Sequence, residues 1–459
     1  MSIISSWRPR RGRNVELLLL VFAIGIVLLA WTNVELATSG AVPSSLLTLG
    51  GGFLGLVLVV HLVLRFKASY ADPILLPAVT LLNGLGLVMI HRLDIAHKRT
   101  IADGLAIRQL SWTAVSVVLA LLVLLILRDH RILRKYTFTA GAAGVALLLL
   151  PMLPLIGSDK NGAGIWIQVG PFSFQPGEVS KILLAVFFAG YLVQTRDALS
   201  VAGSKVLGMT FPRGRDLGPI LVAWAVSILI LVWQRDLGQS LLFFGLFVAM
   251  LYVATERVSW VILGLVMFVG GAFLANALFA HVQTRVLLWL HTFSPEALKA
   301  SDQLAKGLMG MGAGGMIGTG LGRGHPEITY FAETDFIVPS FGEELGMIGL
   351  FALLILYAVI VQRGFRTAIG TRDGFGKLLA VGLAFSVGLQ VFVVVGGVTR
   401  VIPLTGLTAP FLSYGGSSLL ANWVLVALLL RISDHARRPL PDPRTPAIST
   451  DDTQVVKPR

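Results

Sequence analysis

Several ionisable residues of this chain lie at the ends of long apolar segments, where a charge is costly. Glu178 and Lys181 open one such segment, and their i, i+3 spacing would place both on one face of a helix. A charged side chain at membrane depth costs about 2.5 to 3.5 kcal/mol on insertion scales, so such residues are candidates for a functional site. A carboxylate can take a proton from a hydroxyl, and a lysine can bind phosphate as a point charge. The pair therefore suggests acid–base or phosphate chemistry at one helix end.

Other charged residues occupy the short segments between apolar runs. They are Asp236 in a tight turn, Asp335, Glu343 and Glu344 before a later apolar run, and Arg400 in the turn before the last one. A single membrane topology would bring all of them to the outer rim of the protein, and nothing similar lines the inner side. Two interpretations are open: a functional site, or interfacial ion pairs that only help the helices to pack.

The composition identifies the elements that must carry these residues. Of 459 residues, 55% are hydrophobic and only 13% are charged, whereas soluble domains carry about 25% charged residues. Long apolar runs in lipid must be helices, because each backbone polar group has to be satisfied within its own segment. We therefore predict an all-α polytopic membrane protein with about twelve transmembrane helices. The predicted spans are 16–33, 44–64, 73–91, 109–127, 137–156, 178–194, 217–233, 238–254, 259–280, 345–362, 376–397 and 408–431.

The charge pattern predicts the orientation of these helices. The formal net charge is +13, which in a soluble protein would suggest nucleic acid; here we expect no nucleic-acid partner, because Lys and Arg concentrate in alternate loops. Both termini are then cytoplasmic. The arginine-rich N-terminus, with Arg8, Arg10, Arg11 and Arg13, precedes a full-length apolar run, so we expect an uncleaved first helix and no signal peptide. The chain has no cysteine, which excludes disulfides and thiol chemistry.

Residues 281–344 form a long segment on the predicted outer side. It begins with an amphipathic stretch from Arg285 to Leu290, which suits a membrane interface, and it is rich in Gly and Met. Connections of this length are usually functional or disordered, and we expect a functional one. Its glycine stretch, 310–324, lacks the Gly-Lys-Ser/Thr of a phosphate-binding loop, so we expect close backbone packing or a re-entrant turn there. No His/Asp/Glu cluster has the sequence spacing of metal ligands.

Four motifs, in order and with matching spacing, resemble those of the SEDS family (shape, elongation, division and sporulation) of the RodA/FtsW type. They are Trp166-Ile167 with Gln175-Pro176-Gly177-Glu178 and Lys181; Asp236-Leu237-Gly238; Thr334-Asp335-Phe336-Ile337 with Gly342-Glu343-Glu344-Leu345-Gly346; and Ile402-Pro403-Leu404-Thr405-Gly406 with Pro410-Phe411-Leu412-Ser413-Tyr414-Gly415-Gly416-Ser417-Ser418. The resemblance implies a ten-helix core at 73–431. Residues 1–72 would then be a cytoplasmic N-terminus with two additional helices, and 432–459 a disordered cytoplasmic tail.

The resemblance also implies a function. Family members are peptidoglycan glycosyltransferases of the bacterial plasma membrane that polymerise lipid II on the outer face, usually beside a class B penicillin-binding protein. The lipid pyrophosphate leaves as an anion, so cations should neutralise it, and a carboxylate should deprotonate the acceptor hydroxyl. On this basis Glu178, Lys181, Asp236, Arg285, Asp335, Glu343, Glu344, Arg400 and Ser417 are the expected substrate-binding residues. No cofactor is required by the resemblance, and assistance by a divalent cation, Mg²⁺ or Mn²⁺, is left open.

The loop that should carry the catalytic base departs from the family. Relatives have an essential Asp in a pattern like DPxGxGYQ; counting back from Gln303 places Glu296 at this Asp, whereas counting forward from Trp289 points to Pro295. Asp302 lies where relatives have Tyr. Glu296 and Asp302 are therefore the two candidate catalytic residues. If neither acts, the chain would be a silent scaffold for a penicillin-binding protein; a lipid-linked substrate flippase is a further alternative.

Overall fold

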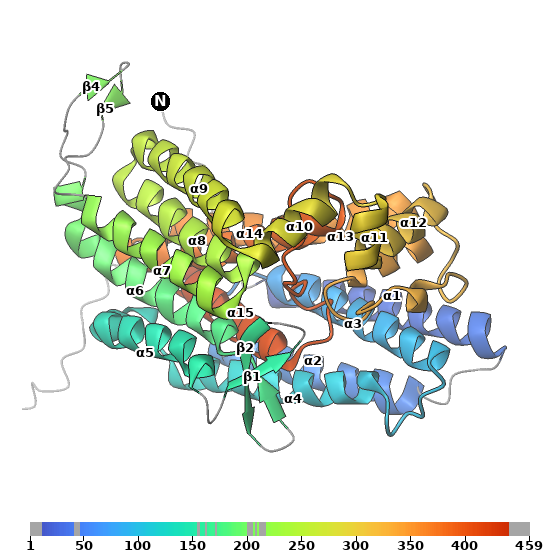
Figure 1. The fold of residues 1–459 in the computed structure, drawn as a ribbon. Helices are drawn as coiled ribbons and strands as arrows, with labels where there is room; N and C mark the ends of the chain where they lie inside the picture. Colours follow the sequence, from blue (N-terminus) through green and yellow to red (C-terminus); the bar gives the residue numbers. More distant parts are fainter. Residues whose placement is uncertain are drawn as a thin grey trace, which may run out of the picture.

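The structure of the protein is a computed structural model, which describes residues 12–40, 46–153, 157–160, 163–169, 172–199, 205–206, 209–210 and 217–439. This part of the chain is a bundle of α-helices (Figure 1). The predicted all-α membrane fold is confirmed. The helices are α1 (Arg13–Ser39), α2 (Gly51–Lys67), α3 (Leu75–Ala96), α4 (Leu105–Ile126), α5 (Thr137–Leu149), α6 (Pro176–Leu199), α7 (Gly218–Gln234), α8 (Leu237–Thr255), α9 (Val258–Leu278), α10 (Ala280–Leu290), α11 (Pro295–Ala300), α12 (Gln303–Gly314), α13 (Ile337–Gly370), α14 (Gly374–Val398) and α15 (Gly416–Arg437).

Eleven helical segments of the described chain are long and apolar enough to cross a membrane. The shorter apolar helix α7, at the seventh predicted span, brings the set to the predicted dozen. Large apolar side chains point outward from the bundle, for example Leu29 and Phe273, which are 71% and 74% exposed. A soluble protein would hide such side chains, whereas lipid accepts them.

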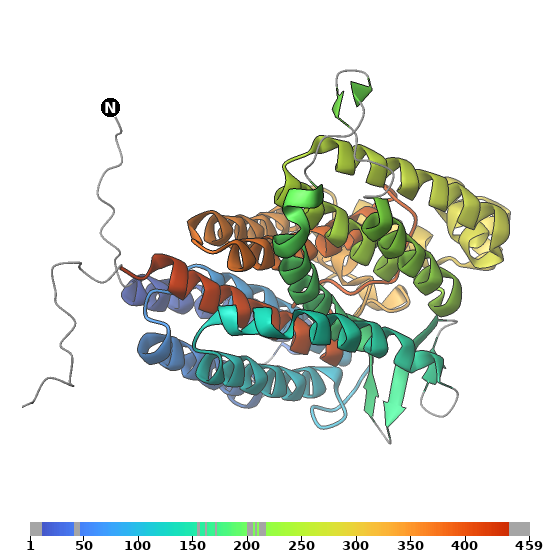
Figure 2. The ribbon, with the colours of Figure 1, turned by 90° about the vertical axis from the view of Figure 1, so that its left-hand side faces the viewer.

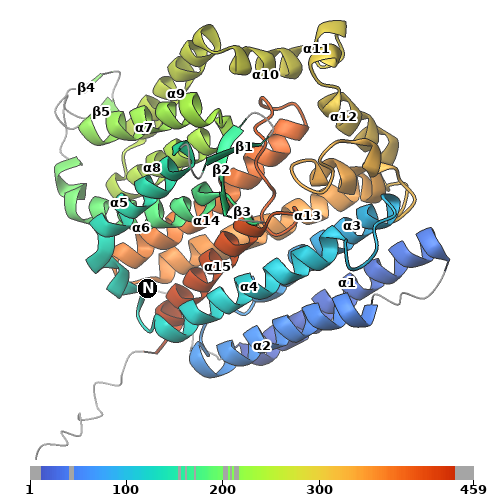
Figure 3. The ribbon, with the colours of Figure 1, turned by 60° about the horizontal axis from the view of Figure 1, so that its bottom comes forward.

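Helices α3, α6, α14 and α15 are the most enclosed, and α1 and α2 lie at the edge of the bundle against α3 and α4 (Figure 3). Buried polar contacts connect the N-terminal pair. Glu16 on α1 accepts from Arg13 at 2.5 Å and lies 2.7 Å from Nδ1 of His61 on α2, while Arg13 also donates to the carbonyl of Ala71. The two additional helices are therefore tied to the rest of the chain. Arg8, Arg10 and Arg11 lie outside the described residues.

Two small antiparallel sheets, which the sequence did not predict, interrupt the helical order. The first comprises β1 (Gly157–Lys160), β2 (Ala163–Val169) and β3 (Phe172–Phe174), with Trp166 paired to Ser158. The second, β4 (Lys205–Val206) with β5 (Met209–Thr210), projects from the bundle (Figure 2). The Trp166-Ile167 motif thus lies in the central strand of the first sheet, and the next strand, β3, precedes α6 and Glu178.

The long segment 281–344 is structured in its described form, as α10, α11, α12 and the short 3₁₀ turn Pro326–Ile328, which together connect α9 to α13 (Figure 3). Two predicted span boundaries need correction. The tenth span, placed at 345–362, belongs to a helix that begins at Ile337 and is broken at Gly346, and the twelfth, placed at 408–431, begins only at Gly416. Helix α15 continues to Arg437, so the start of the expected tail is helical; residues 440–459 lie outside the described chain.

The break in α13 is filled by the glycine stretch, as the prediction of close backbone packing required. Gly346 has φ 67° and ψ −169°, and a Cβ there would lie 2.3 Å from the nitrogen of Gly318. Across the break, the amides of Thr319 and Gly320 donate to the carbonyls of Glu343 and Glu344 at 3.0 and 2.9 Å. Only glycine tolerates both the positive φ and this contact between main chains.

Candidate functional site

Glu178 and Lys181 form the predicted ion pair on one face of α6. The Lys181 ammonium donates to Glu178 at 2.7 Å, to the side-chain oxygen of Gln390 on α14 at 2.8 Å, and to that of Asn422 on α15 at 3.1 Å. Gln390 also donates to the other oxygen of Glu178 at 3.3 Å. The pair thus links three of the most enclosed helices of the bundle.

Both side chains of this pair are buried, although we expected Glu178 and Lys181 to bind the substrate directly. The Lys181 side chain is 1% exposed and that of Glu178 is 4% exposed. All three ammonium hydrogens have acceptors within the protein, because Lys carries three donors and three oxygens surround it. Lys181 therefore supports the site from inside the bundle, because the N–H groups of its ammonium are already bonded to protein oxygens.

Asp236, Arg285 and Asp335 gather at the end of the bundle where α6, α8 and α15 begin, here called the rim cluster. Asp236 caps the N-terminus of α8 by accepting from the amide of Gln239 at 2.9 Å. Arg285 lies on α10, and Asp335 lies just before α13. The three residues come from segments far apart in sequence, and each aspartate interacts electrostatically with the guanidinium of Arg285.

The pKa values of the rim cluster depend on burial and on the neighbouring charges. Burial raises the pKa of Asp236 to about 6; the hydrogen bond from Gln239 and the charge of Arg285 oppose this rise, and the charge of Glu178 adds to it. Burial likewise raises the pKa of Asp335 to about 6, against the hydrogen bond from Thr334 and the charge of Arg285. Burial lowers the pKa of Arg285, and the two aspartates oppose that shift. The cluster therefore contains two carboxyls whose pKa is raised to about 6 beside a cation.

Arg285 and Arg400 hold α10 against the segment that precedes α15. Arg285 donates to the carbonyls of Leu404 and Thr405 at 2.9 and 3.0 Å. Arg400, which has φ 63°, donates to the carbonyls of Trp289 and Leu290, and the indole of Trp289 donates back to its carbonyl at 2.9 Å. Arg400 thus binds the end of α10, and among the described residues it has no hydrogen bond or ion pair with Asp236 or Asp335.

Ser417 lies at the start of α15 and positions the strand-to-helix connection that leads into α6. Its hydroxyl oxygen accepts from the backbone amide of Gln175 at 2.9 Å, and the side chain is buried. The sequence therefore identified a residue next to Glu178 in space, at the point where α6 and α15 begin together.

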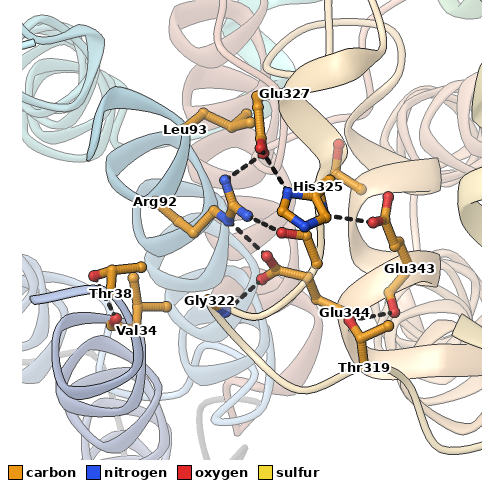
Figure 4. A network of polar contacts seen from close by, with 12 residues as sticks. Val34, Thr38, Arg92, Leu93, Thr319, Gly322, His325, Glu327, Glu343 and Glu344 are labelled. Carbon is orange, nitrogen blue, oxygen red and sulfur yellow. Dashed lines mark hydrogen bonds and ion pairs between the residues drawn. The ribbon is translucent and has the colours of Figure 1, made fainter. Parts of the chain in front are cut away.

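Glu343 and Glu344 belong to a different network, which Figure 4 shows around Arg92 of α3. The Arg92 guanidinium donates to Glu344 and to Glu327, each at 2.6 Å, and to the carbonyl of Gly324. Glu344 also accepts from the amide of Gly322 at 3.0 Å, and Glu343 accepts from the amide of His325. Both carboxylates are buried, and they fasten the glycine stretch to α3 and α13.

The two loop acids lie apart from the rim cluster. Glu296 is exposed in the first turn of α11, and its carboxylate has no hydrogen bond or ion pair to any other described residue. Asp302 is 2.8 Å from the ammonium of Lys306, which also lies 4.7 Å from the ring centre of Tyr330. No contact in the described chain joins either acid to Asp236, Arg285 or Asp335.

Sequence reasoning missed the residues that complete these networks. Gln390 and Asn422 are neutral amides inside long apolar helices, and Arg92 is a cation near the end of α3. A polar amide within an apolar helix is a usable signal, because burying it unpaired would cost free energy. Its partner, however, depends on which helices pack together.

Comparison with known proteins identifies a family and several relatives of this chain. A family model for cell cycle proteins, FtsW/RodA/SpoVE, matches residues 73–438. The chain is 48% identical to peptidoglycan glycosyltransferase RodA of Mycobacterium tuberculosis, covering 97% of this chain and 96% of the relative. It is 32% identical to stage V sporulation protein E of Bacillus subtilis, over 81% of this chain and 99% of that one.

Solved structures agree with this match. A peptidoglycan synthase complex, solved to study how polymerization and crosslinking are coordinated, contains a chain that matches with a TM-score of 0.61 and 26% identity, covering 80% of this chain and 98% of the other. The crystal structure of Thermus thermophilus RodA matches with a TM-score of 0.55 and 25% identity, over 79% and 96% of the two chains. Motifs, fold and sequence similarity agree, and the chain belongs to the SEDS family, the FtsW/RodA/SpoVE cell cycle proteins.

Proposed function

We propose that this protein is a peptidoglycan glycosyltransferase that polymerises glycan strands from lipid II at the outer face of the bacterial plasma membrane. The observation that carries the proposal is the rim cluster, which combines two carboxyls of pKa about 6 with Arg285, and whose Asp236 is influenced by the charge of Glu178 in the buried Glu178–Lys181 pair. Relatives that are 48% identical over nearly the whole chain bear this enzyme name. Those names favour a polymerase over a silent scaffold or a flippase.

The residues divide into two roles. The departing pyrophosphate needs positive charge, which Arg285 supplies at the rim, while Lys181 holds the site in shape from within the bundle. Glu178, Glu343, Glu344, Arg400 and Ser417 then act by positioning the segments around the substrate. Asp236 and Asp335 offer the oxygen ligands that Mg²⁺ or Mn²⁺ prefers, so a divalent cation that assists at the pyrophosphate would be held there.

For the general base we propose Glu296. Its carboxylate is exposed and free of partners among the described residues, so it can reach an acceptor hydroxyl that arrives from outside. Asp302 is engaged by Lys306 at 2.8 Å, so its carboxylate is less available to an acceptor hydroxyl. Substrate binding would have to bring α11 towards the rim cluster, which the loop position of this short helix permits.

We further propose a class B penicillin-binding protein as partner, because one solved relative is a peptidoglycan synthase complex in which polymerization and crosslinking are coordinated.

We also propose that both termini are cytoplasmic. Support comes from the basic residues at the end of the bundle opposite the rim cluster, which include Arg65, Lys67, Arg128, Arg134, Lys135, Arg366 and Arg372.

The test is polymerisation of lipid II by the purified protein, with and without the partner, in the presence of Mg²⁺, Mn²⁺ or a chelator. Glu296→Gln should lower the rate by about a hundredfold or more, the usual contribution of a general base. Asp302→Asn should lower it by less than about tenfold, because its carboxylate is already paired.

Expression and thermal stability of both variants serve as controls, since neither side chain is buried. If Asp302→Asn abolishes synthesis and Glu296→Gln does not, the two assignments are reversed. If the wild type makes no glycan under conditions where a close relative does, the polymerase proposal fails.

A further inference from the structure

Asp129, His130 and His435 come together at the end of the bundle opposite the rim cluster. Asp129 and His130 lie between α4 and α5, and His435 lies in the last turn of α15. Each residue offers one potential ligand atom, and these three atoms lie within 4.8 Å of one another. Two imidazoles and a carboxylate are a typical ligand set for a transition metal.

His130 is held as a metal-ligating histidine is usually held. Its Nε2 lies 2.9 Å from Oδ2 of Asp373, while its Nδ1 is buried and has no hydrogen-bond partner among the described residues. A carboxylate on one ring nitrogen fixes the tautomer and presents the other nitrogen as a ligand. An unpaired buried ring nitrogen is otherwise costly, so its presence calls for a partner that the described part of the chain does not provide.

Asp373 is itself fixed in place. Its Oδ1 caps α14 by accepting from the amide of Gly376 at 2.7 Å, which leaves Oδ2 for His130. Gly376 permits this arrangement, because a Cβ there would lie 2.3 Å from Nε2 of His130. The orientation of the imidazole therefore depends on the start of α14, and three separate segments converge on one point.

Asp129 and His435 both lie beside the imidazole of His130. Oδ1 of Asp129 lies 3.7 Å from Nδ1 of His130 and already accepts from the amide of Arg131, which fixes the carboxylate. The His435 ring meets the His130 ring edge-on, with centres 5.4 Å apart, and its nitrogens have no hydrogen-bond partner among the described residues. The nearby cations are compensated: Arg131 pairs with Asp373 at 3.4 Å and Arg438 with Asp434 at 2.7 Å.

We propose that Nδ1 of His130, an imidazole nitrogen of His435 and the carboxylate of Asp129 bind a divalent transition metal, with Zn²⁺ as the ion that this donor set fits best. Asp373 orients His130 from behind. Three protein ligands leave one tetrahedral position for water. The metal would fasten the end of α15 to the connection between α4 and α5, away from the site of glycan synthesis, and the inference does not rest on the proposed enzymatic activity.

The experiment measures metal binding by the full-length protein, purified through a tag without histidine and dialysed first against a chelator. The probe is Zn²⁺ alone, with Mg²⁺ as a comparison. We expect about one tightly held Zn²⁺ per chain by elemental mass spectrometry, and a rise in Tm with Zn²⁺ that Mg²⁺ does not reproduce.

Three variants and one control make the result specific. His435→Ala and Asp129→Asn should each abolish the Zn²⁺-dependent rise in Tm, and Asp373→Asn should weaken Zn²⁺ binding by about 10- to 100-fold. His97→Gln, an exposed histidine far from the cluster, should bind Zn²⁺ as the wild type does. Wild-type protein that retains no Zn²⁺, or an unchanged Zn²⁺ response in His435→Ala, would overturn the proposal and leave the cluster as a hydrogen-bonded clamp.

Discussion

The ammonium of Lys181 lies 2.7 Å from the carboxylate of Glu178, and both groups are buried where α6, α14 and α15 meet. Gln390 and Asn422 complete the shell around the ammonium. A charge pair so enclosed is stable only as a unit, because each partner neutralises the desolvated charge of the other.

Replacing either member of this pair alone should destabilise the fold. We expect Lys181→Met or Glu178→Gln to lower the free energy of unfolding by about 3–5 kcal/mol, because one charge or polar group is left buried without its partner. The double variant should lose less than the sum of the two. Thermal and denaturant unfolding of the purified proteins measure this, with the exposed Lys98→Met as the matched control.

Polymerisation assays on the same variants distinguish support from direct binding. One outcome is that the Lys181→Met protein folds, reaches the membrane and polymerises lipid II at the wild-type rate. That result would exclude any role of Lys181 in the reaction. Lost activity at unchanged stability would instead show that the ammonium acts on the substrate, and would contradict the purely supporting role that its buried contacts indicate.

Asp236 should make stability depend on pH. Its pKa is about 6 in the fold and 3.8 ordinarily, so the stabilisation from its protonated form is complete below about pH 4 and is lost as the pH rises through about 6. Asp236→Asn keeps an N-cap side chain and removes the titration. We expect the variant's Tm to vary less between pH 4 and 7 than that of the wild type.

Arg285 sets the range in which both rim carboxyls titrate. Its charge opposes the rise in the pKa of Asp236 and of Asp335, so Arg285→Gln should move both titrations to higher pH. Measuring Tm against pH in the Asp335→Asn background isolates the shift at Asp236. A titration that stays in place would mean that the guanidinium does not act on these carboxyls in solution.

The break in α13 should not tolerate a side chain. Gly346→Ala combines φ 67° with a Cβ placed 2.3 Å from a backbone nitrogen, and we expect it to destabilise the protein by at least about 2 kcal/mol. Gly312→Ala in α12 is the matched control, because nothing lies within 4 Å of its new Cβ. Helix propensity should make that control neutral or stabilising by up to about 1 kcal/mol. Equal effects in the two variants would contradict this account.

The chain has no cysteine, so single cysteines can report its orientation. Lys98→Cys, on the rim side, should react with a membrane-impermeant maleimide in intact cells, and Lys135→Cys, at the opposite end, should react only after permeabilisation. Both positions are exposed, so access to the reagent depends on the membrane alone. The reverse pattern would show that the rim cluster faces the cytoplasm.

The sequence by itself determined the class of fold and the family of this protein. Its apolar runs leave no alternative to membrane helices, because lipid offers no hydrogen bonds to an unpaired backbone. Local spacing also predicted the Glu178–Lys181 pair, since i, i+3 residues share a helix face, and the glycine stretch predicted close backbone packing. The motifs predicted which segments belong to a site, while the length and the ends of the helices were less well determined.

Only the tertiary structure decided which charges meet. It separated Glu344, which binds Arg92, and Glu343, which accepts from the amide of His325, from Asp236 and Asp335, which share Arg285. It buried Lys181, and it brought His435 to His130 although no sequence spacing relates them. The physical reason is that hydropathy specifies which residues lie in helices, whereas the partner of a buried polar group is decided by helix packing and by the requirement that each such group find a hydrogen bond or a counter-charge.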